Sequence, residues 1–356
     1  MRLLICAGGT GGGVYPALTV TETLDKTTHQ ILWVGSEGGM EENLVKRTGL
    51  DYQSIQAAGV HGVSIKELPR NLARLMRGYQ QSKQILQSFK PDVMLFTGGY
   101  VAIPMALAGR KYKSLLYVPD IEPGLALKTL ARFSDRIAIT ANDSEQWFKA
   151  KKKMTITGYP LRDDLKKWTR SEARDYFKLE ADVPTILFMG GSSGARSINQ
   201  AVVANLEQLT RDYQVIHLTG LLDWEAVQKN TTEASPRYHA FPYLHEAGAA
   251  LAAADLAVSR AGASTLGEYP YFGLPAILVP YPYAWRYQKV NADYLSDRGA
   301  AVILRDEDLH TQLLDMIQGL FSNPDQLTRM SRNMSSISQP LAAERIAELL
   351  FEMAQA

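Results

Sequence analysis

Short runs of apolar residues alternate along this chain with longer stretches in which apolar positions recur at helical spacing. Such runs, separated by helical stretches, are typical of parallel strands that are buried on both faces. In the first half we predict strands near residues 2–7, 31–35, 53–56, 93–97, 114–118, 136–140 and 154–157. In the second half we predict strands near 185–189, 214–218, 237–240, 256–259, 276–279 and 301–304.

Two glycine-rich turns follow the first strand of each half. They are Gly8-Gly9-Thr10-Gly11-Gly12-Gly13 and Gly190-Gly191-Ser192-Ser193-Gly194-Ala195-Arg196. A strand, a glycine turn and a helix in this order can present backbone N–H groups to a phosphate, although such turns also serve tight packing. The duplication predicts an α/β protein with two Rossmann-like domains, whose parallel sheets face each other across a cleft.

The domain boundary is best placed where a glycine and a proline interrupt the pattern, at Gly158-Tyr159-Pro160. We therefore expect a first domain over 1–159 and a second over 160–340. The segment 341–356 predicts a final helix, since Ala342, Ile346, Leu349, Leu350 and Met353 form one apolar face. This helix could fold back onto the first domain.

Composition and charge narrow the function classes. The chain has 356 residues, 46% of them hydrophobic, which argues against a mainly disordered protein. A net charge of +1 argues against a globally basic nucleic-acid binder. The single Cys6 excludes a disulfide framework and favours a reducing compartment. The first strand leaves no room for a signal peptide, and the sequence has no apolar run long enough to span a membrane.

Six motifs, in order, resemble the MurG family of bacterial peptidoglycan N-acetylglucosaminyltransferases. They are Gly8–Gly12 with Val14-Tyr15-Pro16-Ala17-Leu18, Gly98-Gly99-Tyr100-Val101, Gly158-Tyr159-Pro160-Leu161-Arg162, Gly190–Arg196, Ser259–Glu268 and Gly273-Leu274-Pro275-Ala276. The resemblance covers nearly the whole chain. It implies the glycosyltransferase-B fold and inverting transfer of N-acetylglucosamine from UDP-N-acetylglucosamine to lipid I, which gives lipid II. It implies no cofactor.

The donor site is expected in the second domain. UDP is an anionic leaving group, so positive potential must lie where its charge develops. The second turn would supply N–H groups and a hydroxyl, and Arg162 could reach the diphosphate, unless it only pairs with a neighbouring aspartate. Glu268 could accept hydrogen bonds from the ribose diol or could be a helix N-terminal charge. With the resemblance, the donor-binding residues are Thr10, Gly11, Gly12, Arg162, Ser192, Gly194, Ser264, Thr265, Glu268, Gln288 and Asn291.

The resemblance also implies that Gln288 and Asn291, which share one helical face, hold sugar hydroxyls. The alternative is a solvated helix start. Gly13 and Tyr100 are assigned to the acceptor. No Cys/His metal spacing occurs, and Asp306-Glu307-Asp308 precedes a helix as a simple charge cluster, so we expect no metal.

Two departures from the family affect the catalytic base. The family's first turn ends in His, where this chain has Gly13, and a His-Glu-Gln-Asn segment corresponds to Tyr117–Asp120. Transfer still needs a group that takes the proton of the acceptor hydroxyl. We therefore expect Asp120 or Glu122 to act as the base, in a loop that could equally be an acidic turn between prolines. Among the histidines, His61 is the plausible alternative, and His217 is expected to be a core or strand-end residue.

The segment from Lys66 to Lys83 predicts an amphipathic, basic helix. Its apolar positions are Leu68, Leu72, Leu75, Met76 and Tyr79, and its basic positions include Arg70, Arg74 and Arg77. Such a face can lie on an anionic membrane, or the leucines can pack inside under a solvated basic face. With the resemblance, the expected partners are UDP-N-acetylglucosamine, a polyprenyl-diphosphate-linked acceptor and an anionic membrane surface, with no nucleic acid. The expected location is peripheral, at the cytoplasmic face of the cell membrane.

Three functions remain open from the sequence. The first is transfer to lipid I. The second is a related glycosyltransferase that acts on another lipid or cell-wall acceptor. The third is a sugar-nucleotide-binding protein without catalysis, which the missing His leaves possible.

Overall fold

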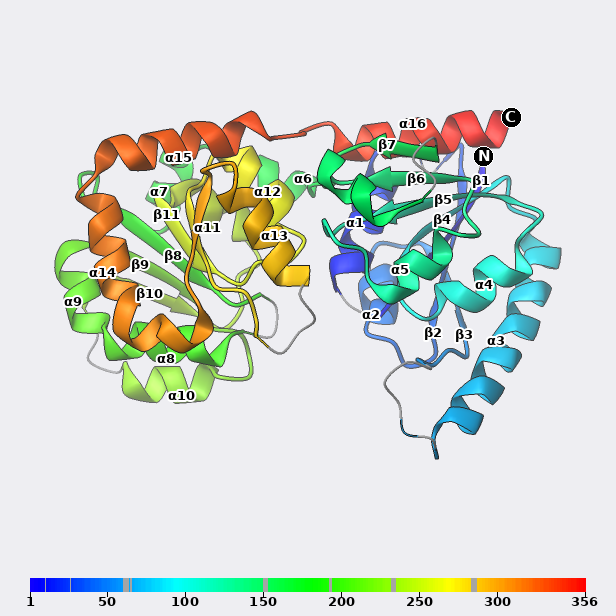
Figure 1. Cartoon of the computed structure of the whole chain (residues 1–356), viewed down its shortest axis with the longest axis horizontal. Helices are drawn as coiled ribbons and strands as arrows, with labels where there is room; N and C mark the ends of the chain where they lie inside the picture. Colours follow the sequence, from blue (N-terminus) through cyan, green and yellow to red (C-terminus); the bar gives the residue numbers. More distant parts are fainter. Residues whose placement is uncertain are drawn as a thin grey trace. The chain divides into compact units, whose positions relative to one another are not determined.

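The computed structural model describes residues 1–9, 11–25, 27–59, 64, 66–149, 153–191, 194–231, 235–282 and 287–356 (Figure 1). The chain divides into two compact units. The first contains Met1–Leu161 together with Leu341–Ala356, and the second contains Arg162–Pro340. Each unit is an α/β domain with its own sheet and its own core.

The first unit is built on a seven-stranded parallel sheet with the order β3-β2-β1-β4-β5-β6-β7. The central position of β1, and the reversal of the strand order between β1 and β4, are features of a Rossmann-like sheet. Its strands are β1 (Arg2–Ala7), β2 (Gln30–Ser36), β3 (Asp51–Ile55), β4 (Val93–Gly98), β5 (Lys113–Val118), β6 (Arg136–Ile139) and β7 (Met154–Ile156).

Helices cover both faces of this sheet. They are α1 (Gly11–Glu22), α2 (Glu41–Lys46), α3 (Leu68–Phe89), α4 (Ala102–Ala108), α5 (Leu125–Leu130), the 3₁₀ helix η1 (Asn142–Trp147) and α16 (Ala342–Gln355). Along β1, Leu3 and Ile5 pack toward α1 and α16, while Leu4 and Cys6 pack toward α3, α4 and α5. Alternation of side chains across a strand explains this division, and both faces are apolar because both are covered.

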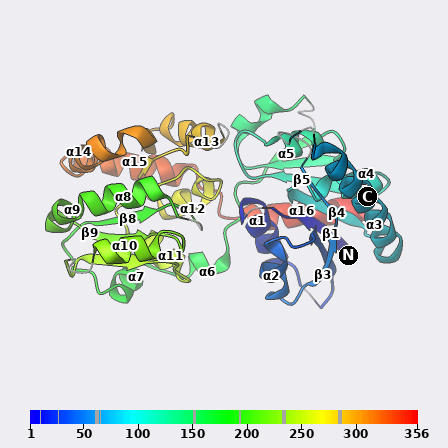
Figure 2. The same cartoon turned by 90° about the horizontal axis from the view of Figure 1, so that it is seen from below.

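The C-terminal helix α16 belongs to the first unit. Ile346, Leu350 and Met353 are buried in the same cluster as Val14 and Ala17 of α1. Figure 2 shows α16 next to α1 on this unit, and α16 also contacts β4 and β5. The last segment of the chain therefore completes the core that the first segment begins.

The second unit repeats the plan with a six-stranded parallel sheet of order β10-β9-β8-β11-β12-β13. The strands are β8 (Thr185–Met189), β9 (Gln214–Leu218), β10 (Tyr238–Phe241), β11 (Leu256–Ser259), β12 (Ala276–Leu278) and β13 (Ala301–Ile303). Here β8 takes the central place that β1 has in the first sheet. The two glycine-rich turns thus follow equivalent strands.

The helices of the second unit are α6 (Asp163–Lys166), α7 (Arg170–Tyr176), α8 (Arg196–Ala204), α9 (Leu206–Asp212), α10 (Trp224–Asn230), α11 (Ala247–Ala253), α12 (Thr265–Phe272), α13 (Tyr287–Ser296), the 3₁₀ helix η3 (Asp306–Asp308), α14 (Leu309–Phe321) and α15 (Pro324–Ser336). Ile198 of α8 and Leu313 of α14 pack with Phe188 and Val258 of the sheet. On the other face, α11 contacts α7, α12 and β8.

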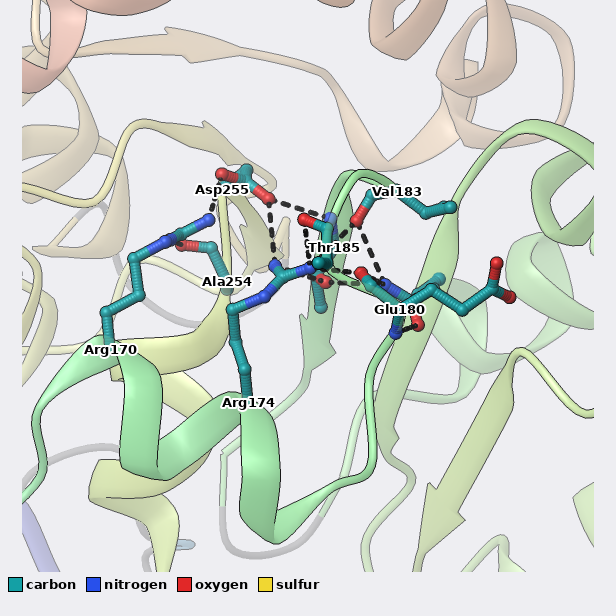
Figure 3. Close-up of polar contacts among 9 residues, drawn as sticks. Arg170, Arg174, Glu180, Val183, Thr185, Ala254 and Asp255 are labelled. Carbon is teal, nitrogen blue, oxygen red and sulfur yellow. Dashed lines mark hydrogen bonds and ion pairs between the residues drawn. The ribbon is translucent and has the colours of Figure 1, made fainter.

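An arginine pair on α7 anchors the amino ends of β8 and β11 (Figure 3). Arg174 donates to the carbonyls of Glu180, Ala181 and Val183, which lie in the loop before β8. Arg170 pairs with Asp255 at 2.6 Å, and the other carboxylate oxygen of Asp255 accepts from the Thr185 N–H at 2.8 Å. Donors with fixed geometry thus satisfy carbonyls that the sheet leaves unpaired.

The predicted fold class is confirmed. Each predicted strand corresponds to an observed strand, with ends that differ by one or two residues, as in 237–240 against Tyr238–Phe241. The helix predicted from Lys66 to Lys83 is α3, which continues to Phe89.

Candidate functional site

The second glycine turn connects β8 to α8 at the carboxyl edge of the second sheet. Gly191 and Gly194 have φ angles of +89° and +81°, which only glycine adopts readily. A Cβ atom on Gly194 would lie 2.2 Å from the carbonyl oxygen of Thr219. The predicted residue Ser192 lies outside the described residues. The N-cap of α8 is Ala195, whose side chain makes no capping hydrogen bond.

A buried network of polar side chains packs against the second glycine turn. Asn199 donates to the carbonyl of Thr219 at 2.9 Å and to Asp223 at 3.0 Å. His217 bridges Asn199 Oδ1 and the Tyr238 hydroxyl at 2.9 and 2.8 Å. Burial lowers the pKa of His217 to about 3, so the imidazole is neutral near pH 7. The expectation that His217 is a core residue is confirmed by its complete burial.

Glu268 lies in the first turn of α12, partly buried. Burial raises the pKa of Glu268, while the charge of Arg162 and a hydrogen bond from Ser264 oppose this rise. Arg162 also forms an ion pair with Asp164 at 3.4 Å. The fold therefore brings Arg162 and Glu268, which are far apart in sequence, within electrostatic reach inside one domain. A carboxylate that is desolvated in this way can accept hydrogen bonds strongly.

Thr265 and the first turn of α13 surround the same loop. Thr265 Oγ1 donates to the carbonyl of Gly262 at 2.7 Å. Asn291 is fully buried and donates to the carbonyl of Ala261 at 3.1 Å, whereas Gln288 accepts from the Tyr281 N–H at 2.9 Å. The alternative of a solvated helix start is thus wrong for Asn291. Its described hydrogen bond fixes the loop that leads into α12.

An arginine for which the sequence predicted no role lies at the carboxyl edge of the second sheet. Arg260 directly follows β11, and its side chain is largely buried. It forms an ion pair with Asp306, donates to Ser197 Oγ at 2.8 Å and donates to the carbonyl of Val279 at 3.2 Å. Asp306 is therefore more than a helix N-terminal charge. The available signal was the position of Arg260 at a strand's carboxyl end.

The first glycine turn packs closely against the loop after β4. Gly9, Gly98 and Gly99 have φ angles of +91°, +130° and +84°. A Cβ atom on Gly99 would lie 2.4 Å from the carbonyl oxygen of Gly8, so the two backbones approach more closely than any side chain allows. The predicted residue Thr10 lies outside the described residues. Gly11 and Gly12 begin α1.

The Gly13 position is enclosed by β4. Thr97 Oγ1 donates to the carbonyl of Gly13 at 2.6 Å, and a Cβ atom on Gly13 would lie 3.1 Å from the Thr97 carbonyl oxygen. A His side chain at this position would press against that carbonyl. Tyr100, by contrast, is about half exposed and lies beside Gly59.

The two predicted carboxylates occupy different environments in the loop after β5. Glu122 is buried and pairs with Lys128 at 3.0 Å. Asp120 is partly buried, and its charge contributes to raising the pKa of Tyr117. Thr140 Oγ1 lies 2.9 Å from the carbonyl of Pro119 and holds the start of this loop. The predicted alternative base, His61, lies outside the described residues.

Comparisons with known proteins agree with this arrangement. Residues 3–139 match the glycosyltransferase family 28 N-terminal domain, and residues 185–346 match the C-terminal domain of the same family. A relative from Desulforamulus reducens is 36% identical, with 97% of both chains covered. Its name is UDP-N-acetylglucosamine--N-acetylmuramyl-(pentapeptide) pyrophosphoryl-undecaprenol N-acetylglucosamine transferase. The chain belongs to glycosyltransferase family 28.

Solved structures of glycosyltransferases and of a sugar-nucleotide epimerase share the fold of this family 28 enzyme. The crystal structure of Acinetobacter baumannii MurG matches with a TM-score of 0.78 and 26% identity over 99% of both chains. A Neisseria meningitidis UDP-GlcNAc 2-epimerase shares the fold, with a TM-score of 0.70 at 13% identity. The predicted family and the glycosyltransferase-B fold are confirmed, and the chain is a glycosyltransferase.

The described part of the family 28 chain contains neither a metal-ligand cluster nor a membrane-spanning helix. Within the ranges above, His, Cys, Asp and Glu side chains form no group of three that could hold a metal ion. Among the helices of these ranges, none has the length and apolar character needed to cross a bilayer.

Proposed function

We propose that this enzyme transfers N-acetylglucosamine from UDP-N-acetylglucosamine to lipid I with inversion, and that lipid II is the product. Relatives whose names state this reaction match both domains at 34–36% identity over nearly their whole length. The structural observation that carries the proposal is the pair Glu268 and Arg162. It combines an ionisable acceptor with a fixed cation at the carboxyl edge of the second sheet, where α/β proteins bind nucleotides.

The donor binds to the second domain. Glu268 accepts hydrogen bonds from the ribose hydroxyls, and the Ser264–Thr265 turn positions its helix. The diphosphate lies at the α8 N-terminus and the Gly194 turn, with Ser192 as a further donor, because N–H groups and the helix dipole favour an anion. Gln288 faces the sugar, and the fully buried Asn291 supports the donor site through the Ala261 loop that it holds.

Arg162 stabilises the leaving group. As the bond between the sugar C1 and the diphosphate oxygen breaks, negative charge grows on UDP. A guanidinium is always protonated and offers several donors, so it can follow this charge. The ion pair of Arg162 with Asp164 is compatible with the role, because a guanidinium carries several N–H donors.

The first domain binds the lipid-linked acceptor, with Gly13 and Tyr100 near the acceptor sugar. The acceptor hydroxyl attacks C1, and its proton passes to a carboxylate of the loop after β5. We assign this role to Asp120 in preference to Glu122, since Lys128 already neutralises Glu122. An ion pair stabilises the charged form of a carboxylate and lowers its tendency to take a proton.

The helix α3 mediates contact with an anionic membrane. Leu72 and Met76 are 52% and 62% exposed, so these apolar residues do not fill the core as the alternative required. Arg70, Arg74 and Arg77 occupy a different face of the helix, where they line a cavity of about 340 Å³ together with Gln56 and Ala73. A helix that exposes apolar residues on one face and arginines on another can place the apolar residues among acyl chains and the charges at the headgroups. The enzyme then acts peripherally at the cytoplasmic face, where nucleotide sugars occur.

Turnover assays separate this proposal from its alternatives. The purified enzyme is incubated with UDP-N-acetylglucosamine and lipid I, and both UDP release and lipid II are measured. Release of UDP with lipid II formation supports the proposal. Transfer only to another lipid acceptor would favour a related glycosyltransferase, which the Gly13 departure makes worth testing. Donor binding without UDP release for any acceptor would indicate a non-catalytic protein.

A further inference from the structure

A buried carboxylate lies directly beneath the first glycine turn. Glu41, at the start of α2, has no exposed surface. One of its oxygens accepts from the Ser36 N–H at 2.7 Å and from the Ser36 hydroxyl at 2.6 Å. The other oxygen accepts from the Gly9 N–H at 3.3 Å. The carboxylate therefore joins the end of β2 to the turn that follows β1.

The surrounding backbone is shaped to admit this carboxylate. A Cβ atom on Gly8 would lie 2.4 Å from Glu41 Oε1, and one on Gly39 would lie 2.3 Å from the same atom. The carboxylate thus occupies the space that side chains at both positions would need. Gly8 also packs its carbonyl oxygen against Gly99. The turn is held between Glu41 on one side and the Gly98-Gly99 loop on the other.

The charge of Glu41 is held by hydrogen bonds. Among the described residues, none of the ion pairs includes Glu41, so N–H and O–H donors stabilise it. The same charge contributes, after burial, to raising the pKa values of Cys6 and Tyr52, so the carboxylate lies close to both side chains. Burying a carboxylate is costly, and an apolar side chain could fill such a space at lower cost. The reason for a glutamate at position 41 is therefore the hydrogen-bond geometry of its carboxylate and not a gain in folding stability.

We infer that Glu41 is a positioning residue for the transfer reaction: it holds the Gly9 N–H and so fixes the first glycine turn in the shape that binds substrate. The inference rests on the proposed function, which places substrate at this turn. Glu41 itself is buried and contacts no substrate. Its effect on catalysis passes through the backbone of Gly8 and Gly9.

The variant Glu41→Gln tests this inference with little change in volume. A glutamine has only one carbonyl oxygen, and the two donors of Ser36 will retain it. The amide NH₂ then faces the Gly9 N–H, where two donors meet and the hydrogen bond is lost. Ser36→Ala is the graded variant, since it removes one donor to Glu41 but leaves the Gly9 contact intact. Glu42→Gln is the matched control, because Glu42 is the next residue on α2 and forms an ion pair with Lys46 at the surface.

Three measurements are made on each folded variant: steady-state kinetics for donor and lipid I, UDP affinity, and hydrogen exchange of the peptide that covers the first turn. For Glu41→Gln we expect kcat/KM to fall by roughly 10–100-fold, as a displaced substrate-binding group would cause. UDP affinity should change far less than kcat/KM, because the proposed contacts to UDP lie in the second domain, and the turn should exchange faster. Ser36→Ala should show a smaller loss, and Glu42→Gln should match the parent.

Kinetics of folded Glu41→Gln equal to those of the parent would overturn the inference, and so would an unchanged exchange rate at the turn. A lower melting temperature with unchanged kinetics would show a purely structural role. Failure of the proposed function is distinguishable, because the parent itself would then fail to make lipid II. In that case the exchange experiment still decides whether Glu41 holds the turn.

Discussion

The Lys128 ammonium lies 3.0 Å from Glu122 Oε1. This ion pair distinguishes Glu122 from Asp120, the other carboxylate that could serve as the base. Glu122 is only 4% exposed, so its charge depends on Lys128, which also lies over the Trp147 ring. Removing one partner of a largely buried pair leaves the other charge without compensation. If Glu122 were the base, its protonation would break the ion pair with Lys128 at each turnover. Glu122 is therefore assigned a structural role.

We expect Asp120→Asn to lower kcat by roughly two to four orders of magnitude, the usual span for a lost general base. UDP affinity should barely change. The paired variant Glu122→Gln should mainly lower the melting temperature. Turnover of both variants with lipid I, normalised to folded protein, provides the comparison. A kcat of Asp120→Asn within a few-fold of the parent would contradict the assignment, and His61 would be the next residue to test.

Glu268 should govern UDP affinity. Replacing it with Ala removes hydrogen bonds to a charged group, so we expect binding to weaken by roughly 1.5–3 kcal/mol. Calorimetric titration with UDP measures this change, with Glu268→Gln as a variant of similar shape. Equal affinity of a folded Glu268→Ala variant and the parent would exclude the ribose role.

The same residue predicts a cost in stability. Burial raises the pKa of Glu268, so its contribution to stability is present below the usual glutamate pKa and is lost as the pH rises through the raised value. Near neutral pH, Glu268→Gln should therefore be at least as stable as the parent. Urea unfolding of both proteins at several pH values checks this, and a variant that is less stable at neutral pH would contradict it.

His217 predicts acid sensitivity of the second domain. Its pKa is lowered from 6.5 to about 3 by burial, so the unfolded chain takes up a proton that the folded domain refuses. Stability is lost as the pH falls through this window, at 1.36 kcal/mol per pH unit, or about 2 kcal/mol between pH 6.5 and 5. The variant His217→Gln should lack this part of the pH dependence. The prediction would be refuted if the free energy of unfolding depended on pH in the same way for the parent and for His217→Gln over this range.

The basic residues of α3 should determine membrane binding. Replacing Arg70, Arg74 and Arg77 with Gln should weaken binding to anionic vesicles, by about 1 kcal/mol per charge at low salt. The difference from the parent should shrink at high salt, because screening weakens the attraction of the parent. Vesicle co-sedimentation measures both effects. A control with the same charge change at Lys178, Arg329 and Arg332 should bind like the parent, and equal binding of all three proteins would contradict the prediction.

The sequence by itself determined the alternation of strands and helices. The reason is local: buried parallel strands need short runs of apolar residues, and residues such as Leu3, Leu4 and Ile5 show such a run whichever face each side chain takes. Glycine at positions 9 and 194 is equally local, because backbone conformations with positive φ exclude most other residues. The family motifs, which are short and contiguous, could also be identified from the sequence.

Only the tertiary structure decided which side chains meet. The periodicity of α3 marked Leu72 and Met76 as one face, but whether another element covers that face depends on packing elsewhere, and here they are exposed. The contacts of Glu41 with Gly9, of Arg260 with Asp306 and of Asn199 with His217 join elements that are distant in sequence. The residues next to a charged or hydrogen-bonding group in the sequence do not reveal its partner, because the order of strands in the sheet determines which distant residues lie close to it.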